Sequence, residues 1–214
     1  IRLWDVETSK SLHVFDGHED FILCVDISPL QNNNKNYYNN NKMNNIGVIG
    51  GNGYTICSGS TDKTIRIWDI ETTKELNIFK GHERQISSVK YGSNELSNII
   101  LSGSYDNSIR LWDIRSSQQI QAFNKHTAPV LSVEYSQFVI KNINGSSNVI
   151  CSGSIGNTIR FWDIRSSNQL YAIKGNDDGD GTICLKFFRL KNKDNVNDIK
   201  LCYGSYKGSI RIWG

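Results

Sequence analysis

The pentapeptide IRLWD at residues 109–113 decides the fold, because close copies of it recur along the whole chain. The copies read IRLWD at 1–5, IRIWD at 65–69, IRFWD at 159–163 and IRIWG at 210–214. The repeats therefore end near residues 5, 69, 113, 163 and 213, and their tryptophans are separated by 64, 44, 50 and 51 residues. A period in the forties is typical of a unit of four short strands.

One repeat unit contains four runs of β-branched or aromatic residues with turn residues between them. The runs cover residues 86–91, 99–104, 108–114 and 119–123. No segment of the chain has sustained helical periodicity. Four such strands cannot bury both faces of their own sheet, so neighbouring units must stack on one another. Radial stacking of four-stranded antiparallel sheets predicts an all-β fold, the β-propeller.

The long first interval between tryptophans has a visible cause in residues 31–45, which read QNNNKNYYNNNKMNN. This low-complexity stretch has no apolar periodicity, so we predict a disordered, asparagine-rich surface insert. Shorter polar inserts at 142–148 and 191–197 lengthen later repeats at the same point. One type of loop therefore accommodates the growth of the repeats.

Composition narrows the class of protein. Lys and Arg number 24 against 21 for Asp and Glu, so the formal charge is only +3, and nothing demands nucleic acid or an anionic membrane. No apolar run approaches the roughly 20 residues that span a bilayer, and no signal peptide opens the chain. The five cysteines have no metal-ligand spacing and read as small buried residues of a reducing compartment. We expect a cytoplasmic or nuclear protein without metal or disulfides.

A Gly-His pair before each unit and a Trp-Asp pair at its end carry a resemblance to a known family. The pair is complete at Gly17-His18 and Gly81-His82. With the recurring Trp-Asp, this pattern resembles the WD-repeat (β-transducin-like) family over nearly the whole chain outside the insert. The resemblance implies a protein-interaction scaffold on a β-propeller, usually of seven blades.

The resemblance also implies a stabilising tetrad of His, Ser or Thr, Asp and Trp in each repeat. Matched position by position, the third repeat has Gly156 in place of the Asp, and the fourth has Asn176, Tyr203 and Lys207 in place of His, Ser and Asp. The tetrad residues present are His18, Ser58, Asp62 and Trp68, then His82, Ser102, Asp106 and Trp112, and finally His126, Ser152 and Trp162.

In this family a sequence repeat supplies the outer strand of one blade and the inner three strands of the next. Residues 1–16 should then give two outer strands, 17–174 three complete blades, and 175–214 three strands without an outer partner. Pairing residues 11–15 with the last strands would close a four-bladed ring but leave 1–4 unpaired. We therefore expect the whole chain, 1–214, to be an open arc, a fragment of a probable seven-bladed ring.

The sequence argues against an enzyme. Three of the four histidines occupy tetrad positions, which leaves only His13, in an outer strand, unassigned. The chain has no Gly-rich phosphate loop, no G-x-S-x-G elbow and no metal-spaced set of ligands. We predict no catalytic residues, no cofactor, no metal and no small-molecule substrate.

An arginine recurs two residues before every tryptophan and has two interpretations. Because it follows the blade symmetry, it should lie in similar grooves between blades and pair locally. The alternative is a basic stripe that contacts nucleic acid, as in a subunit of an RNA- or chromatin-associated complex. The residues are Arg2, Arg66, Arg110, Arg160 and Arg211.

The tetrapeptide WDIR occurs twice, at 112–115 and 162–165. It resembles the box by which WD-repeat substrate receptors dock on the damaged-DNA-binding adaptor of cullin-RING ubiquitin ligases. Arg115 and Arg165 would then reach an acidic cleft of the adaptor. The alternative is that both arginines are solvent-exposed turn residues, and the 31–45 insert is expected on the same face.

On the opposite face, relatives bind peptides through residues that flank the turn Asp or open the inner strand. The mixture of aromatic and polar residues at these positions suits a protein-binding rim. The alternative is that the tyrosines are ordinary turn residues. The turn positions hold Thr61, Tyr105, Ile155 and Tyr206, and the strand openings hold Phe21, Gln85 and Pro129.

Overall fold

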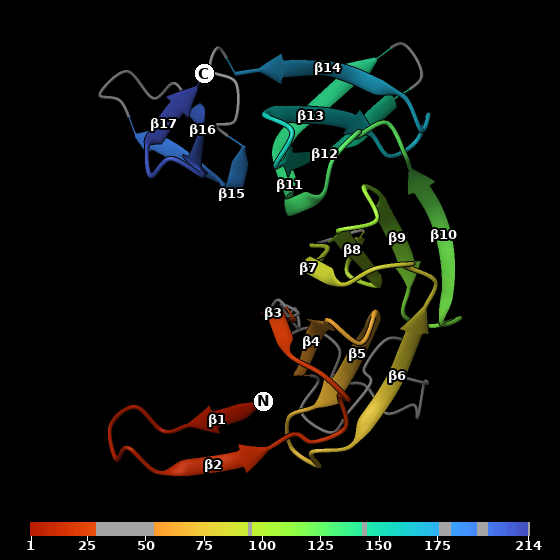
Figure 1. Ribbon diagram of the computed structural model, residues 1–214, viewed down its shortest axis with the longest axis vertical. Coiled ribbons are helices and arrows are strands. Elements are labelled where there is room, and N and C mark those ends of the chain that lie inside the picture. The colour runs from red at the N-terminus through yellow and green to blue at the C-terminus, as the bar shows by residue number, and fades with distance from the viewer. Residues whose placement is uncertain (29–53, 94–95, 143–144, 176–180, 192–196, 214) are drawn as a thin grey trace, which may run out of the picture.

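The computed structural model describes residues 1–28, 54–93, 96–142, 145–175, 181–191 and 197–213. Its strands form five antiparallel sheets that follow one another along an open arc (Figure 1). The N-terminal hairpin, β1 and β2, lies at one end of the arc, and the sheet of β15, β16 and β17 lies at the other. The predicted all-β propeller architecture is confirmed.

Each sheet is built from consecutive strands of the chain. The N-terminal hairpin consists of β1 (Arg2–Trp4) and β2 (Ser11–Val14). The first blade consists of β3 (Ile22–Ile27), β4 (Thr55–Ser60), β5 (Thr64–Asp69) and β6 (Glu75–Lys80). The second consists of β7 (Ile86–Tyr91), β8 (Ile99–Ser104), β9 (Ile109–Asp113) and β10 (Gln118–Phe123).

The third and fourth blades follow the same order. The third consists of β11 (Val130–Asn142), β12 (Gly145–Ser154), β13 (Thr158–Asp163) and β14 (Gln169–Lys174). The fourth consists of β15 (Thr182–Lys191), β16 (Asn197–Ser205) and β17 (Ile210–Trp213). Two outer strands, three complete blades and three further strands are the division that strand order predicted.

The predicted strand boundaries are confirmed for β7 and β8 and were wrong by one residue at both ends of β9 and at the start of β10. The predicted run 108–114 is shorter in β9, because Ser108 and Ile114 belong to the flanking turns, and β10 begins one residue early. The polar stretch 142–148 is also more regular than a loop, since Ser146 and Asn148 extend β12 and pair with β11. The insert 31–45 lies outside the described residues.

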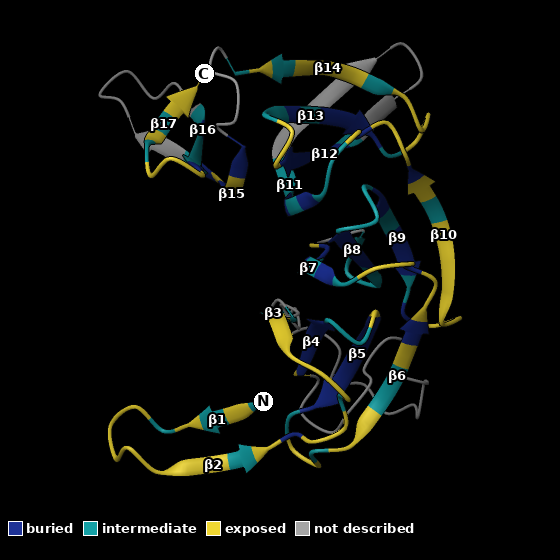
Figure 2. Ribbon diagram, in the orientation of Figure 1, coloured by how far each residue is buried: buried dark blue, intermediate teal, exposed yellow. Residues whose placement is uncertain are grey.

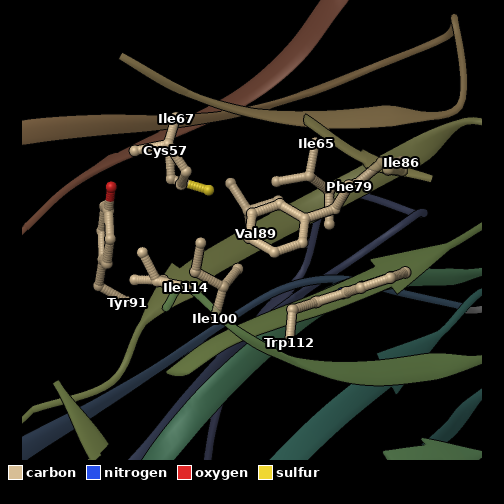
Figure 3. Close-up of a cluster of buried hydrophobic side chains, with 10 residues drawn as sticks. All are labelled: Cys57, Ile65, Ile67, Phe79, Ile86, Val89, Tyr91, Ile100, Trp112 and Ile114. Atoms are coloured by element: carbon tan, nitrogen blue, oxygen red, sulfur yellow. The ribbon is translucent and has the colours of Figure 1, made fainter. Parts of the chain in front are cut away.

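The core consists of clusters between blades rather than within one sheet. Successive residues of a strand point to opposite faces, so Ile100 packs in the cluster shared with the first blade, and Leu101 packs in the cluster shared with the third. Figure 3 shows the first of these clusters, with Cys57, Ile65 and Ile67 facing Ile100 and Trp112. This explains why the middle strands are apolar on both faces, and why burial is greatest in the middle sheets (Figure 2).

Candidate functional site

Four side chains from two strands, the turn between them and a loop form a hydrogen-bonded chain at the first repeat. His18 Nδ1 lies 2.7 Å from Asp62 Oδ2, and His18 Nε2 lies 2.7 Å from Ser58 Oγ. The Trp68 indole donates to the same Ser58 oxygen at 2.8 Å. Because the carboxylate only accepts, His18 Nδ1 carries the hydrogen, and Ser58 donates to Nε2. The network thus ties the loop before β3 to the turn after β4 and to β5.

The second repeat carries the same network with nearly the same geometry. His82 lies 2.7 Å from both Asp106 Oδ2 and Ser102 Oγ, and Trp112 donates to Ser102 at 2.8 Å. A fifth member that sequence reasoning missed is Ser108, which donates to Asp106 Oδ1 at 2.6 Å. The missed signal was a Ser or Thr two residues after the tetrad Asp position in every repeat.

The third repeat keeps only part of the network. His126 Nε2 lies 2.7 Å from Ser152 Oγ, and Trp162 donates to Ser152 at 2.9 Å. With Gly156 at the Asp position, the partner of His126 Nδ1 among the described residues is Thr158 Oγ1, at 3.2 Å. In the fourth repeat, Tyr203 and Lys207 offer no equivalent set, and Asn176 lies outside the described residues.

Protonation follows from these surroundings. Burial lowers the pKa of His18 and His82 against the opposing effect of their Asp partners. Burial acts to raise the pKa of Asp62, but hydrogen bonds from Thr64 and His18 bring it below the ordinary 3.8. His126 has no Asp, and burial together with Arg160 lowers its pKa to about 4. Neutral imidazoles beside ionised carboxylates are the native state of the two complete networks at neutral pH.

Three of the five recurring arginines donate a hydrogen bond to the outer strand of their own blade. Arg66 Nη1 donates to Glu75 at 2.6 Å, Arg110 Nη1 donates to Gln119 at 2.7 Å, and Arg160 Nη1 donates to Gln169. In the first two blades the guanidinium also approaches the tetrad Asp, at 3.8 Å and 3.6 Å. In the third blade Gly156 replaces the tetrad Asp, and Arg160 Nε is buried without a hydrogen-bond partner in the described part of the chain.

The rim residues meet in pairs at one end of successive blades. The backbone N–H of each turn residue donates to the carbonyl of the residue that opens the inner strand. The pairs are Thr61 with Phe21 at 2.9 Å, Tyr105 with Gln85 at 3.0 Å, Ile155 with Pro129 at 3.0 Å, and Tyr206 with Gly181 at 2.8 Å. The sequence missed Gly181, because no side chain marks it.

Exposure differs among the rim side chains. Phe21 is 77% exposed and Tyr206 is 66% exposed, whereas Tyr105 is half-buried and Ile155 is 36% exposed. Phe21 directly precedes β3 of the first blade, and Tyr206 directly follows β16 of the fourth, so the second and third blades lie between them. The rim therefore offers two exposed aromatic side chains with less prominent ones between them.

Arg115 and Arg165 are exposed and occupy equivalent turns at the other end of the blades. Their backbone N–H groups donate to Asp113 and Asp163, at 2.8 Å and 2.9 Å. The preceding blade holds the first of these turns, because Asn77 on β6 donates to the carbonyl of Ile114 at 2.7 Å. Gln121 on β10 similarly donates to Ser167 in the second turn.

His13 occupies on β2 the register position that Asn77 occupies on β6. There it lines a hollow of about 340 Å³ between the N-terminal hairpin and the first blade. A second hollow, of about 280 Å³, lies beside the first tetrad. It is lined by Glu19, Asp62, Lys63, Thr64, Arg66, Lys80, Gly81 and His82. Among the described residues, no cluster of His, Cys, Asp and Glu fits a metal ion, and no helix could cross a membrane.

A family model described as WD domain, G-beta repeat matches residues 9–33, 39–69, 73–113 and 117–163. The chain belongs to the WD-repeat family. This family is in general non-catalytic and serves protein interaction. The tetrads and the four-stranded blades described above are consistent with this assignment.

The similarity of this WD-repeat chain to curated relatives extends over about two fifths of its length. Autophagy-related protein 16 of Arabidopsis thaliana is 29% identical over 43% of this chain and 22% of its own length. The guanine nucleotide-binding protein subunit beta of Schizosaccharomyces pombe is 27% identical over 42% of this chain and 36% of its own. Cell division control protein 4 of Saccharomyces cerevisiae is 28% identical over 42% and 17%. The matched segments span little more than a third of these relatives at most.

The fold also matches a solved structure, that of the computationally designed Ika4 protein. The TM-score is 0.62 with 20% sequence identity, and the match covers 94% of each chain. At this identity the match concerns the fold alone.

Proposed function

We propose that the chain is a non-catalytic scaffold that binds other proteins through the rim formed by the paired turn and strand-opening residues. The observation that carries this proposal is the exposure of Phe21 and Tyr206 at the same end of blades whose turns are fixed by backbone hydrogen bonds. Exposed aromatic side chains on a rigid frame are typical anchors of protein interfaces.

The rim also carries charge that would orient a partner. Asp20 stands next to Phe21, and Glu83 and Arg84 precede Gln85, and all three charged residues are exposed. Charges at the edge of an apolar contact chiefly set association rate and specificity. The partner that fits is a protein segment with apolar anchors flanked by charges of both signs.

The test combines affinity purification with mass spectrometry on Phe21→Ala, Tyr105→Ala and Tyr206→Ala variants. We expect each change to deplete a common set of partners, with the largest loss for Phe21. The matched control is Ile120→Ala, since Ile120 is 53% exposed on the outer strand β10, away from the rim. Partners recovered in undiminished amounts from all three rim variants would remove the basis of the proposal.

A second candidate function is that of substrate receptor for a cullin-RING ubiquitin ligase. It is favoured by the equivalent placement of the exposed Arg115 and Arg165, each in a turn whose backbone is bonded to the preceding Asp. We expect the double change Arg115→Glu and Arg165→Glu to abolish capture of the ligase adaptor. Equal capture by the wild type and this double variant would exclude it.

A role in an RNA- or chromatin-associated complex is a weaker alternative, with nucleic acid reached only through other proteins. The local pairing of Arg66, Arg110 and Arg160 supports a structural use of these arginines. Retention on nucleic acid that falls steeply with salt would instead favour direct contact. A cytoplasmic or nuclear location is part of the proposal, and the free thiols of all five cysteines are in accord with it.

A further inference from the structure

The third blade keeps the donors that surround the tetrad Asp elsewhere, although Gly156 stands at the Asp position. In the first blade, Asp62 accepts hydrogen bonds from His18 Nδ1, from the backbone of Glu19, and from both the backbone and the hydroxyl of Thr64. The second blade has the same arrangement in the same register. In the third blade the matching positions hold His126, Thr127, Thr158 and Arg160.

Two of these donors are buried and lack the acceptor that their counterparts have. Arg160 Nε is buried without a partner among the described residues, whereas the same atom of Arg66 and Arg110 donates to a hydroxyl at 3.4 Å and 3.3 Å. His126 is 4% exposed, and its Nδ1 lies 3.2 Å from Thr158 Oγ1, in place of the 2.7 Å bond to a carboxylate. Buried donors of this kind favour an acceptor that reaches them.

The charge around this position is also reversed in the third blade. In each of the first two blades, a glutamate follows the tetrad His and an aspartate occupies the turn, and here both positions are uncharged, as Thr127 and Gly156. The residue before the tetrad His is glycine in those blades and Lys125 here, while the arginine is retained as Arg160. At these matched positions the third blade therefore favours an anion.

The donors are reachable from the rim. In the complete tetrads the Asp side chain is only 6% exposed and covers the hydroxyl beneath it, so the counterparts of Thr158 are buried, whereas Thr158 itself is half-buried. The entrance is lined by two small residues, because a Cβ added to Gly156 would lie 3.0 Å from that of Ala128. Ile155, which is 36% exposed on the rim, is the next residue along the turn.

We propose that an aspartate or glutamate of the bound partner places its carboxylate beside His126, Thr158 and Arg160, where Asp62 and Asp106 lie in their own blades. The proposal rests on the proposed binding at the rim, and it adds the chemistry of one anchor, an acidic side chain next to the apolar contact at Ile155. Hydrogen bonds to an ionised acceptor are shorter and stronger than those between neutral groups. The partner thereby completes the third tetrad.

The first test uses sodium formate as the carboxylate probe, against sodium chloride at the same ionic strength. NMR titration of the imidazoles should show the pKa of His126 rising from about 4 to about 5, because an anion beside the ring favours its charged form. His18 and His82 are internal controls and should not respond, since each already has its carboxylate. Gly156→Asp should abolish the response of His126.

A His126 pKa that formate leaves unchanged would overturn the proposal. The same result is expected if an aspartate of the neighbouring stretch 177–180, which lies outside the described residues, already occupies the position. A response of His18 and His82 equal to that of His126 would also overturn it, because it would indicate a general effect of the salt.

The second test asks whether the carboxylate belongs to the partner. We expect Gly156→Asp to weaken binding of the partners that Phe21→Ala and Tyr206→Ala deplete by at least tenfold, because its own carboxylate takes the position. Amide substitution of the partner's acidic residue should weaken binding to the wild type but not to Gly156→Asp. Partners that the rim variants lose but Gly156→Asp retains would overturn this proposal and leave the rim function intact. A formate response with partners unaffected by every rim variant would instead overturn the rim function and assign the donors to a free carboxylate ion.

Discussion

Replacing Asp62 with Ala removes the acceptor on which the first tetrad depends. Its carboxylate accepts from His18 Nδ1 at 2.7 Å, from Thr64 Oγ1 at 2.6 Å and from the backbone of Thr64 and Glu19 at 2.9 Å and 3.1 Å. Arg66 adds an ionic contact at 3.8 Å. Removing the carboxylate takes this acceptor from all of these donors at once, and Arg66 alone among them keeps its hydrogen bond to Glu75.

Two features of the structure limit the loss of stability expected for Asp62→Ala. Leaving buried donors unsatisfied typically costs about 1 to 3 kcal/mol. The 280 Å³ hollow that Asp62 lines admits water to the exposed donors, which reduces the loss. The third blade also forms with Gly156 at this position, so the carboxylate is not essential to the blade. We therefore expect a cost of about 2 kcal/mol.

The assay is urea and thermal unfolding of wild type and Asp62→Ala. A loss of about 2 kcal/mol should lower the Tm by roughly 4 to 8 °C for a chain of this size. Asp16→Ala, at an exposed position before Gly17, is the matched control and should change the Tm little. Superimposable melting curves for Asp62→Ala and wild type would refute the stabilising role assigned to the tetrad.

Three further predictions concern the third blade and the turns. The pKa of His126 is lowered to about 4 in the folded chain, so below pH 6.5 the unfolded chain binds more protons than the folded one. The free energy of unfolding should therefore fall by up to roughly 3 kcal/mol from pH 6.5 to 4. A His126→Asn variant should show a flatter dependence of stability on pH in the same range. Gly156→Asp should stabilise the fold by about 1 kcal/mol and raise the pKa of His126, since the new carboxylate can accept a hydrogen bond from His126. The added Cβ meets that of Ala128 at 3.0 Å. NMR titration measures the pKa of His126, and an unchanged pKa would contradict the prediction. Asn77→Ala should lower the free energy of unfolding by about 1 kcal/mol, because the hydrogen bonds of Asn77 to Ile114 and Ser117 are lost. His13→Ala, at the same register position on β2, should lower it by less. Equal losses in the two variants would contradict the role of Asn77.

Much of the fold follows from the sequence because the strands are short, alternate with turn residues and recur. The run 86–91 and the run 99–104 become β7 and β8 without change. Position matching within the repeat also brings His18, Ser58 and Trp68 together across 40 and 10 residues of sequence. A repeat aligns residues that have the same surroundings, so one recognised position identifies the others.

The contacts between blades could not be predicted in the same way. Asn77 reaches the carbonyl of Ile114, 37 residues away, and nothing in a run of outer-strand residues distinguishes it from its neighbours. Lys90 and Glu134 have no local pattern either, because their pairing depends on which faces of two sheets meet. Such contacts follow from packing, and the sequence pattern specifies only which residues are buried.

Each sheet divides its side chains between two interfaces, and this division sets how the ends of the arc behave. In the second blade, Trp112 packs toward the first blade, and Leu111 packs toward the third, so both residues are buried. In the fourth blade, Trp213 packs against Tyr171 of the third blade but is still 40% exposed, and Ile212 on the opposite face is 65% exposed. The same strand pattern is therefore a core element or an exposed apolar surface according to its neighbour alone. The stability of any one blade is thus a property of the junctions on its two sides, as expected for repeat proteins.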